Sequence, residues 1–340
     1  MIQINTLLKN EKGMMLIWFY LLIAVLVIMG GSLYALSFQE SQLISIDQSR
    51  DKAFYLAEAG LDRKLQELRS ANTNNISSTS LGDGVYSVTY DNTTKQIRSI
   101  GTVNGLSKTV ITVVSKIPPP GAKAAITSAG NMSFSGNIQV DGRDHDSNGN
   151  LNGDSGTYGA SAGGTVTQSG SSDIGGNGIA PASPANPATI EQNATGNTYS
   201  TPEALLGVAS GSLDQYKTSS PPSLPMSGIV YYTGDSWIAP DFGTDSTPST
   251  GILIVHNTTS NALLKNLHGT FKGIIIADDL VHVNGDAEII GAIIANTSTG
   301  TTGLGSAEVK YSSEILSNLP TGNYSIVSWE DTQNTAYTYS

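Results

Sequence analysis

The segment Lys9-Asn-Glu-Lys-Gly-Met-Met15 leads directly into an apolar run that ends at Leu36. From Met14 to Leu36 the chain carries no charged side chain. A helix over this run is about 34 Å long, enough to cross the roughly 30 Å hydrocarbon core of a bilayer. Lysines precede the run, whereas Glu40 and Asp47 follow it. This asymmetry predicts a membrane-spanning helix whose N-terminus stays cytoplasmic.

Two simpler interpretations of the run are a cleaved secretory signal and an ordinary signal anchor. A secretory signal has an apolar region of about 7–15 residues and a small-residue cleavage site. The present run is longer, and Tyr34-Ala35-Leu36 is a poor cleavage site. The ordinary anchor remains an open alternative.

The helical pattern continues beyond membrane length. Residues 37–69 contain no proline and one glycine. Apolar residues recur there at spacings of three and four, which is typical of one face of a helix. They are Phe54, Ala57, Leu61, Leu65 and Leu68. We therefore expect one long helix over 14–70 whose second half needs a partner along this stripe.

Lys12-Gly13 before the apolar run and Ala53-Phe-Tyr-Leu-Ala-Glu-Ala-Gly60 on its extension resemble the type IV pilin and pseudopilin superfamily. The nearest match is to PilX-type N-terminal domains, with similarity to GspK-type minor pseudopilins. The resemblance implies a prepilin-type leader at 1–13, cleaved after Gly13 by a prepilin peptidase, with Met14 methylated. It implies an inner (cytoplasmic) membrane protein, with its bulk periplasmic or extracellular or in the pilus. Its partners would be other pilin-like subunits and the inner-membrane assembly platform. The residues expected to pack in a filament are Trp18, Phe54, Ala57, Glu58, Leu61 and Leu65.

Trp18 marks a departure from the major pilins. Major pilins carry a glutamate at the fifth position after the cleavage site, whereas this chain has Trp18 there. An ionised side chain within a membrane requires a partner. In lacking this glutamate, the chain resembles minor components proposed to sit at a filament tip.

The composition of the 340-residue chain excludes several classes of protein. There is no cysteine, so no disulfide stabilises an exported domain. The net charge is −11 and the basic residues are few and unclustered, which argues against nucleic-acid binding. With 37 glycines, the chain has the composition of a β protein with many turns.

A small antiparallel β meander is predicted over 81–117, after a polar linker at 70–82. Its strands cover 84–90, 96–103 and 107–114, and Asn104-Gly105 is a strong hairpin signal. The meander is expected to pack on the second half of the long helix. Pro118-Pro-Pro-Gly121 marks the best domain boundary.

The region 121–316 is predicted to be a parallel β-helix, so that the fold class is mainly β with one long N-terminal helix. Four apolar segments begin at Ile229, Ile252, Ile274 and Ala292. The intervals between these starts are close to the ~20 residues that form one coil of a β-helix. A β-sandwich with regular turns is the alternative. Residues 155–222 are expected to form a mobile insertion, with a short helix capped by Thr201. The tail 317–340 contains a predicted last strand at 324–330.

A polar loop near position 150 has the ligand spacing of a calcium site. Asp144, Asp146 and Asn148 stand at positions one, three and five of an EF-hand-like loop, and the Asn150 carbonyl stands at seven. The glutamate usual at position twelve is missing, and Asp154 lies one residue early. Calcium is therefore a candidate cofactor, and a plain polar turn is the alternative.

No motif for catalysis is present, so the chain is not expected to be an enzyme. His256 and His282 lie near predicted strand ends, and the adjacent Asp278 and Asp279 point to opposite faces of a strand. Because β-helices also host polysaccharide-acting enzymes, a membrane-anchored β-helix that binds or cleaves polysaccharide remains the alternative function. The preferred prediction is a minor pilin-like component with a β-helix displayed for assembly priming or adhesion, where a surface glycan or host molecule is a further candidate ligand.

Overall fold

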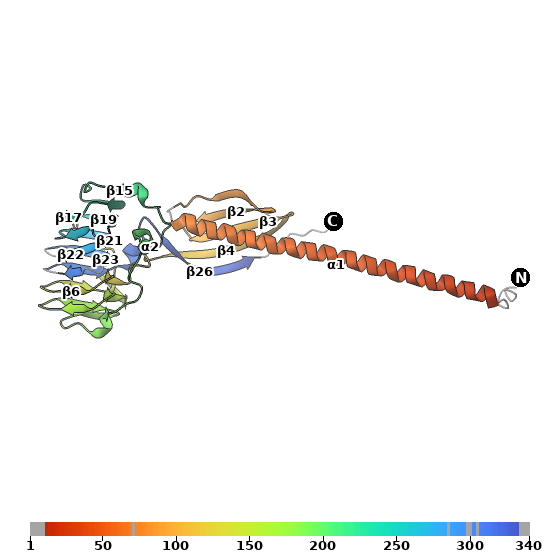
Figure 1. Ribbon diagram of the computed structural model, residues 1–340, viewed down its shortest axis with the longest axis horizontal. Coiled ribbons are helices and arrows are strands. Elements are labelled where there is room, and N and C mark those ends of the chain that lie inside the picture. The colour runs from red at the N-terminus through yellow and green to blue at the C-terminus, as the bar shows by residue number, and fades with distance from the viewer. Residues whose placement is uncertain (1–10, 70–71, 284–285, 297–300, 304–305, 333–340) are drawn as a thin grey trace.

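The computed structural model describes residues 11–69, 72–283, 286–296, 301–303 and 306–332. The protein is mainly β with one long N-terminal helix. The helix projects far beyond a sheet that lies along its second half, and a second β region lies beyond the end of this sheet (Figure 1).

The helix α1 spans Glu11–Arg69 without interruption. From Met15 to Ser45 every side chain is exposed. This is the one helix in the described chain that is long and apolar enough to cross a membrane, with a hydropathy of 2.4 over its most apolar window. The predicted helix over 14–70 is thus confirmed as far as Arg69, and residue 70 lies outside the described residues.

An antiparallel five-stranded sheet, here called the head sheet, covers the second half of α1 in the order β1-β2-β3-β4-β26. Its strands are β1 (Ile76–Leu81), β2 (Gly84–Asp91), β3 (Gln96–Val103), β4 (Leu106–Ile117) and β26 (Asn323–Thr332). Asn104 and Gly105 both have positive φ, at 51° and 79°, as a tight hairpin between β3 and β4 requires.

The head sheet has two strands more than the predicted meander. The segment 70–82, predicted as a linker, contains β1, in which only Ile76 is buried. Ser and Thr fill the four positions between Ile76 and the exposed Leu81, so the strand carries almost no apolar signal. The predicted last strand at 324–330 is present as β26, and it pairs with β4 rather than with the second β region.

In the part of the chain that the structure describes, the second domain contains many short strands and four short helices. Its first part consists of β5 (Ala124–Ser128), β6 (Met132–Phe134), β7 (Gln139–Asp141), β8 (Arg143–His145), β9 (Leu151–Gly156), β10 (Tyr158–Ala162), β11 (Val166–Gln168), β12 (Asp173–Gly176), β13 (Ile179–Ala182), η2 (Pro187–Thr189) and β14 (Ile190–Glu191). Its second part consists of α2 (Pro202–Leu206), η3 (Asp214–Tyr216), β15 (Lys217–Thr218), β16 (Ile229–Tyr232), β17 (Ser236–Ile238), β18 (Gly243–Thr244), β19 (Thr247–Val255), β20 (Leu263–Lys265), β21 (Thr270–Ala277), β22 (Asp279–Val283), β23 (Glu288–Ala295), β24 (Thr301–Gly303), β25 (Glu308–Tyr311) and α3 (Ser313–Ser317).

The strands β16, β19, β21 and β23 stack side by side in parallel. Ile229 pairs with Ile252, Ile252 with Ile274, and Ile274 with Ala292, so the predicted segment starts are in register. Gly251 and Gly273, the residues just before Ile252 and Ile274, are also paired between β19 and β21. A Cβ on Gly273 would lie 1.9 Å from the Gly251 carbonyl oxygen, which explains why only glycine fits.

The sheets of this domain are mixed, because β12 with β13 and β18 with β19 pair antiparallel. The stacking order also differs from the chain order. The first strand, β5, lies between β23 and β10 in the middle of the stack. The chain therefore begins at the centre, builds one side, crosses over and returns to the centre from the other side.

The segment 155–222, predicted as a mobile insertion, contains strands that belong to the stack. β10 pairs with β5 and β12 pairs with β7, both in parallel. The inward side chains Ala160 and Ala162 are fully buried but small, and they leave little apolar signal. The predicted cap is present, since the Ala204 N–H donates to the Thr201 hydroxyl at 3.2 Å. The helix ends at Leu206 and is capped by Gly207, which has φ 70°.

Candidate functional site

The long helix presents two different surfaces, and the boundary between them lies near Ser49. On the N-terminal side the apolar residues are open to solvent, with Trp18 67% exposed. On the C-terminal side Ala53, Ala57 and Leu68 are almost completely buried against the head sheet. An exposed apolar surface of this length needs a partner that the chain itself does not supply.

Small residues let the head sheet approach the helix closely. Ala53, Ala57 and Gly60 recur at spacings of four and three, so they lie on one side of α1. A Cβ on Gly60 would lie 2.5 Å from the Ser99 hydroxyl oxygen of β3. A Cβ on Gly101 would lie 2.0 Å from the Ala53 carbonyl oxygen. The Ala-Glu-Ala-Gly motif therefore has a packing explanation within the chain.

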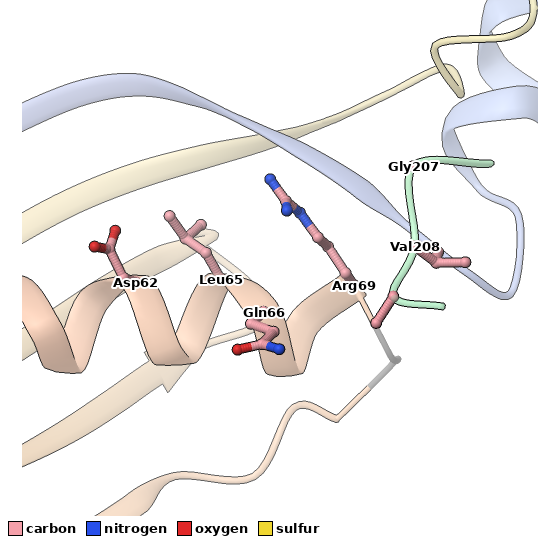
Figure 2. Close-up of a pocket in the computed structure, with 7 residues that line it drawn as sticks. Asp62, Leu65, Gln66, Arg69, Gly207 and Val208 are labelled. Atoms are coloured by element: carbon pink, nitrogen blue, oxygen red, sulfur yellow. The ribbon is translucent and has the colours of Figure 1, made fainter. Parts of the chain in front are cut away.

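Three residues of the helix, Phe54, Glu58 and Leu65, are only half-buried, and Phe54 lies next to β26. The Phe54 ring packs edge-on against Trp329 of β26, and the two ring centroids are 6.1 Å apart. The centroid of the neighbouring Tyr55 ring lies 5.8 Å from that of Phe54. Leu65 lines a cavity of about 470 Å³ between α1 and the segment after α2. Figure 2 shows Leu65 and Arg69 on the helix, with Gly207 across from it.

A buried lysine closes the end of the helix. The Lys64 ammonium is fully buried and donates to the carbonyl oxygens of Asn72 at 2.9 Å and Asn74 at 2.5 Å. It lies 3.6 Å from a Glu67 carboxylate oxygen and 5.7 Å from the centroid of the Tyr90 ring. Desolvation lowers the pKa of Lys64. The side chain thereby fixes the chain that leads into β1.

The predicted filament contacts divide into two groups. Ala57 and Leu61 are covered by the chain's own sheet, so they are not available to a second subunit. Trp18 is open, and Phe54, Glu58 and Leu65 are partly open. Gly13 and Met14 lie within α1, while residues 1–10 of the predicted leader lie outside the described residues.

The predicted calcium ligands lie on β8, on β9 and in the loop between them. Asp144 is buried and accepts from the Ser313 N–H and hydroxyl, both at 2.7 Å. Asp146 accepts from the backbone N–H groups of Asn148 at 2.8 Å and Asn150 at 2.9 Å. The side chain of Asp154 lies outside the described residues. Asp144 is thus held against α3, and Asp146 organises the turn that follows β8.

A histidine–aspartate pair is the polar group that the sequence analysis missed. His256 Nδ1 lies 2.5 Å from Asp278 Oδ1, and Asp278 is 1% exposed. His256 and Asp278 each follow the last residue of strands that are in register, β19 and β21. His256 and Asp278 are therefore separated by the same interval as Ile252 and Ile274, and this equal spacing was the sequence signal for the pair. Among the side chains that the structure describes, no group of three His, Cys, Asp or Glu residues is placed to hold a metal ion.

Comparisons with known proteins give little further information. No family model matches the chain, and no curated protein matches it. Among solved structures, the chain is similar to the crystal structure of the competence-associated pilin ComZ from Thermus thermophilus, at 12% identity. This match covers 84% of the present chain and 97% of the other, with a TM-score of 0.20. At this TM-score the likeness carries no argument, so function is inferred below from the chain's own geometry.

Proposed function

We propose that the protein is a minor pilin-like structural component of a type IV pilus or a related filament. The observation that carries the proposal is the division of α1 into an exposed apolar half and a half covered by the head sheet. One continuous helix thus joins a membrane-length segment rigidly to a folded head. This arrangement suits a subunit that is stored in a membrane and then packed, helix against helix, in a filament.

The exposed half is long enough for a bilayer and apolar enough to remain there. From Met15 to Leu36 all side chains are exposed and none is charged. Burial of an apolar side chain stabilises by about 1.5–3 kcal/mol, so a bilayer or a bundle of similar helices is strongly favoured over water. The lysines before the run support a cytoplasmic N-terminus.

Two finer assignments belong to the same proposal. The PilX-type class is supported by Lys12-Gly13, by the Ala-Glu-Ala-Gly motif and by Trp18 at the fifth position after Gly13. A parallel β-helix in the second domain is supported over a β-sandwich by the parallel, in-register ladders of β16, β19, β21 and β23. Under this proposal the second domain is displayed for assembly priming or adhesion, and the protein is not an enzyme.

Processing of the N-terminus provides the first experiment. Mass spectrometry of membranes from expressing cells should find an N-terminal peptide that begins with methylated Met14. A Gly13→Leu variant should retain residues 1–13. The control is Gly31→Leu, because a Cβ at Gly31 meets no atom within 4 Å and processing should be unchanged. Retention of residues 1–13 by the unaltered protein, with Met14 unmethylated, would contradict the proposal.

Cross-linking tests the expected partners, and the absence of cysteine makes the chain a clean background for it. A Leu43→Cys variant places a thiol on the exposed half of α1, where the side chain is 60% exposed. It should cross-link to other pilin-like subunits or to the assembly platform in membranes. The matched Asn92→Cys variant, in the turn between β2 and β3, should not form these products.

The alternative is a surface domain on an ordinary anchor that binds or cleaves polysaccharide. The observation that favours it is the polar cavity beside His256. Deletion of the gene without any filament defect, together with an intact leader, would support this alternative.

Calcium binding by the β8–β9 loop stays a prediction. If the loop binds calcium, EDTA will lower the melting temperature. Two melting curves that coincide, with and without EDTA, would remove the loop as a calcium site.

A further inference from the structure

A polar cavity of about 360 Å³ lies at one corner of the second domain, beside β15 and the ends of β16 and β19. Residues of several neighbouring segments line it: Lys217, Tyr231, Thr233, Asp235, His256, Asn257, Thr258 and Thr259. Its volume falls within the range of about 300–1,000 Å³ that is usual for small-molecule sites. All of these residues belong to the second domain and none to α1, so the filament proposal makes no use of the cavity.

The parallel stack builds this corner. Tyr232, Val255 and Ala277 are in register, and the residues that follow them therefore occupy equivalent positions at successive levels of the stack. At two adjacent levels these residues are His256 and Asp278, and this places the imidazole directly beside the carboxylate.

Asp278 holds the imidazole in one orientation. Its carboxylate is buried and accepts from the backbone N–H groups of Asn257 and Ala262, both at 3.1 Å. It also accepts from His256 Nδ1 at 2.5 Å. Because a carboxylate only accepts, Nδ1 carries the hydrogen, and Nε2 is the nitrogen left for the cavity.

The other polar groups of the cavity are also fixed by the protein. Asp235 Oδ1 accepts from the Asn257 side-chain amide at 3.1 Å, which leaves Oδ2 as an acceptor. The Lys217 ammonium lies 2.6 Å from an Asp214 carboxylate oxygen and 5.1 Å from the Tyr231 ring centroid. Burial raises the pKa of Tyr231, and nearby acids reinforce the effect, so its hydroxyl stays protonated at neutral pH.

These groups select the charge of a ligand. Lys217 is already paired with Asp214, and Asp235 has no cationic partner among the described ion pairs. An anionic ligand would thus meet an unneutralised carboxylate. An apolar ligand would leave the fixed donors and acceptors without partners, which costs free energy. A neutral ligand with several hydroxyl groups can satisfy acceptors and donors at once.

We propose that this cavity binds a sugar unit of a neutral saccharide, with His256 Nε2 and Asp235 Oδ2 as its principal polar contacts. The site is independent of filament assembly, because its residues belong to the second domain and those of the filament proposal belong to α1.

The test uses the full-length protein in a zwitterionic detergent without a sugar headgroup, since a glycoside detergent would compete for the site. An array printed with neutral, amino-sugar and uronic-acid oligosaccharides is probed first. The strongest neutral oligosaccharide is then titrated by calorimetry. We expect saturable binding to neutral oligosaccharides and weaker or no binding to uronic acids.

Two variants locate the binding in this cavity. His256→Gln and Asp235→Asn should each weaken binding by about 10- to 100-fold, the effect of losing a hydrogen bond to a charged or well-oriented group. The matched control is His268→Gln. His268 also pairs with an aspartate, Asp286, at 3.1 Å, but both side chains are exposed and lie outside the cavity. This variant should bind as the unaltered protein does.

Circular dichroism of each variant shows whether it is folded. The proposal is overturned if no neutral oligosaccharide binds to the folded protein, if uronic acids bind as well as neutral sugars, or if His256→Gln binds without loss. Each of these results leaves the N-terminal processing experiment unaffected, so the two proposals fail separately.

Discussion

Gly101 of β3 provides the sharpest test of how the head sheet is held on the helix. A Cβ at this position would lie 2.0 Å from the Ala53 carbonyl oxygen and 2.6 Å from the Ala57 backbone nitrogen. Ordinary contact begins at 3.4 Å, so the sheet would have to move away by about 1.4 Å. Both contacted atoms belong to the helix backbone, and no side-chain rotation relieves them.

Gly101→Ala therefore changes the stability of the head through two effects of opposite sign. Alanine is favoured over glycine within a strand by about 0.5–1 kcal/mol. Overpacking of a closely packed interface costs about 1–3 kcal/mol, and occasionally more. Because backbone atoms are contacted, the upper part of that range applies, and the net loss of stability is about 2 kcal/mol. The strand preference of alanine alone predicts a gain in stability. The sign of the measured change in stability therefore shows whether this preference or the overpacking is larger.

Native-state hydrogen exchange in detergent micelles measures this effect where it occurs. Amides of β2, β3 and β4 should exchange about 30-fold faster in Gly101→Ala than in the unaltered protein. Peptides of β19, β21 and β23 serve as an internal reference and should not change. The control is Gly31→Ala, which adds a Cβ to the same helix in open space. Equal or slower exchange of the head amides in Gly101→Ala would refute the close-packing argument.

Three further predictions concern the other packed regions. Gly273→Ala should accelerate exchange across β19, β21 and β23 by more than tenfold, because its Cβ would lie 1.9 Å from the Gly251 carbonyl oxygen; unchanged exchange would contradict the stack. Lys64→Met should loosen β1 by about 1–3 kcal/mol, since two carbonyl oxygens lose their donor; exchange of the β1 amides measures this. Burial and the neighbouring Tyr90 raise the pKa of Tyr324 to about 12. Above pH 10 the unfolded chain therefore loses the proton of this phenol before the folded chain does, and the stability of the head falls between pH 10 and 12. Urea unfolding at pH 9 and pH 11 should show a smaller decrease for Tyr324→Phe, and an equal decrease would show that this phenol is not responsible.

The sequence predicts the elements whose side chains are large and periodic. The long helix follows from a stripe of apolar residues, and the register of β16, β19, β21 and β23 follows from the intervals between Ile229, Ile252 and Ile274. The strands β1 and β10 escape prediction because their residues are mostly Ser, Thr, Gly and Ala. Small side chains pack well in a narrow stack, but they leave no hydrophobic pattern along the chain.

The helix face was predicted only in part, and for a related reason. The predicted stripe includes Phe54 and Leu65, whereas the residues in the closest contact are Ala53 and Gly60. Periodicity identifies large apolar residues, but the closest approach of two backbones needs the smallest ones. The pairing of His256 with Asp278 was missed because it depends on two levels of the stack, 22 positions apart. Such a contact becomes visible only when the register is known.

The connection between the two domains fits a display role for the second one. The second domain is inserted between β4 and β26, which are neighbours in the head sheet, and Ile117 at the end of β4 pairs with Asn323 at the start of β26. The two covalent connections thus leave the head side by side. The Asn323 side-chain amide donates to the Leu206 carbonyl oxygen at 2.6 Å, so the end of α2 is fixed to the same junction. A single linker would let the domain swivel, whereas two adjacent strands and a buried hydrogen bond restrict rotation about the junction. Because β26 also packs on α1 through Trp329, a load on the second domain would pass through the head sheet into the long helix.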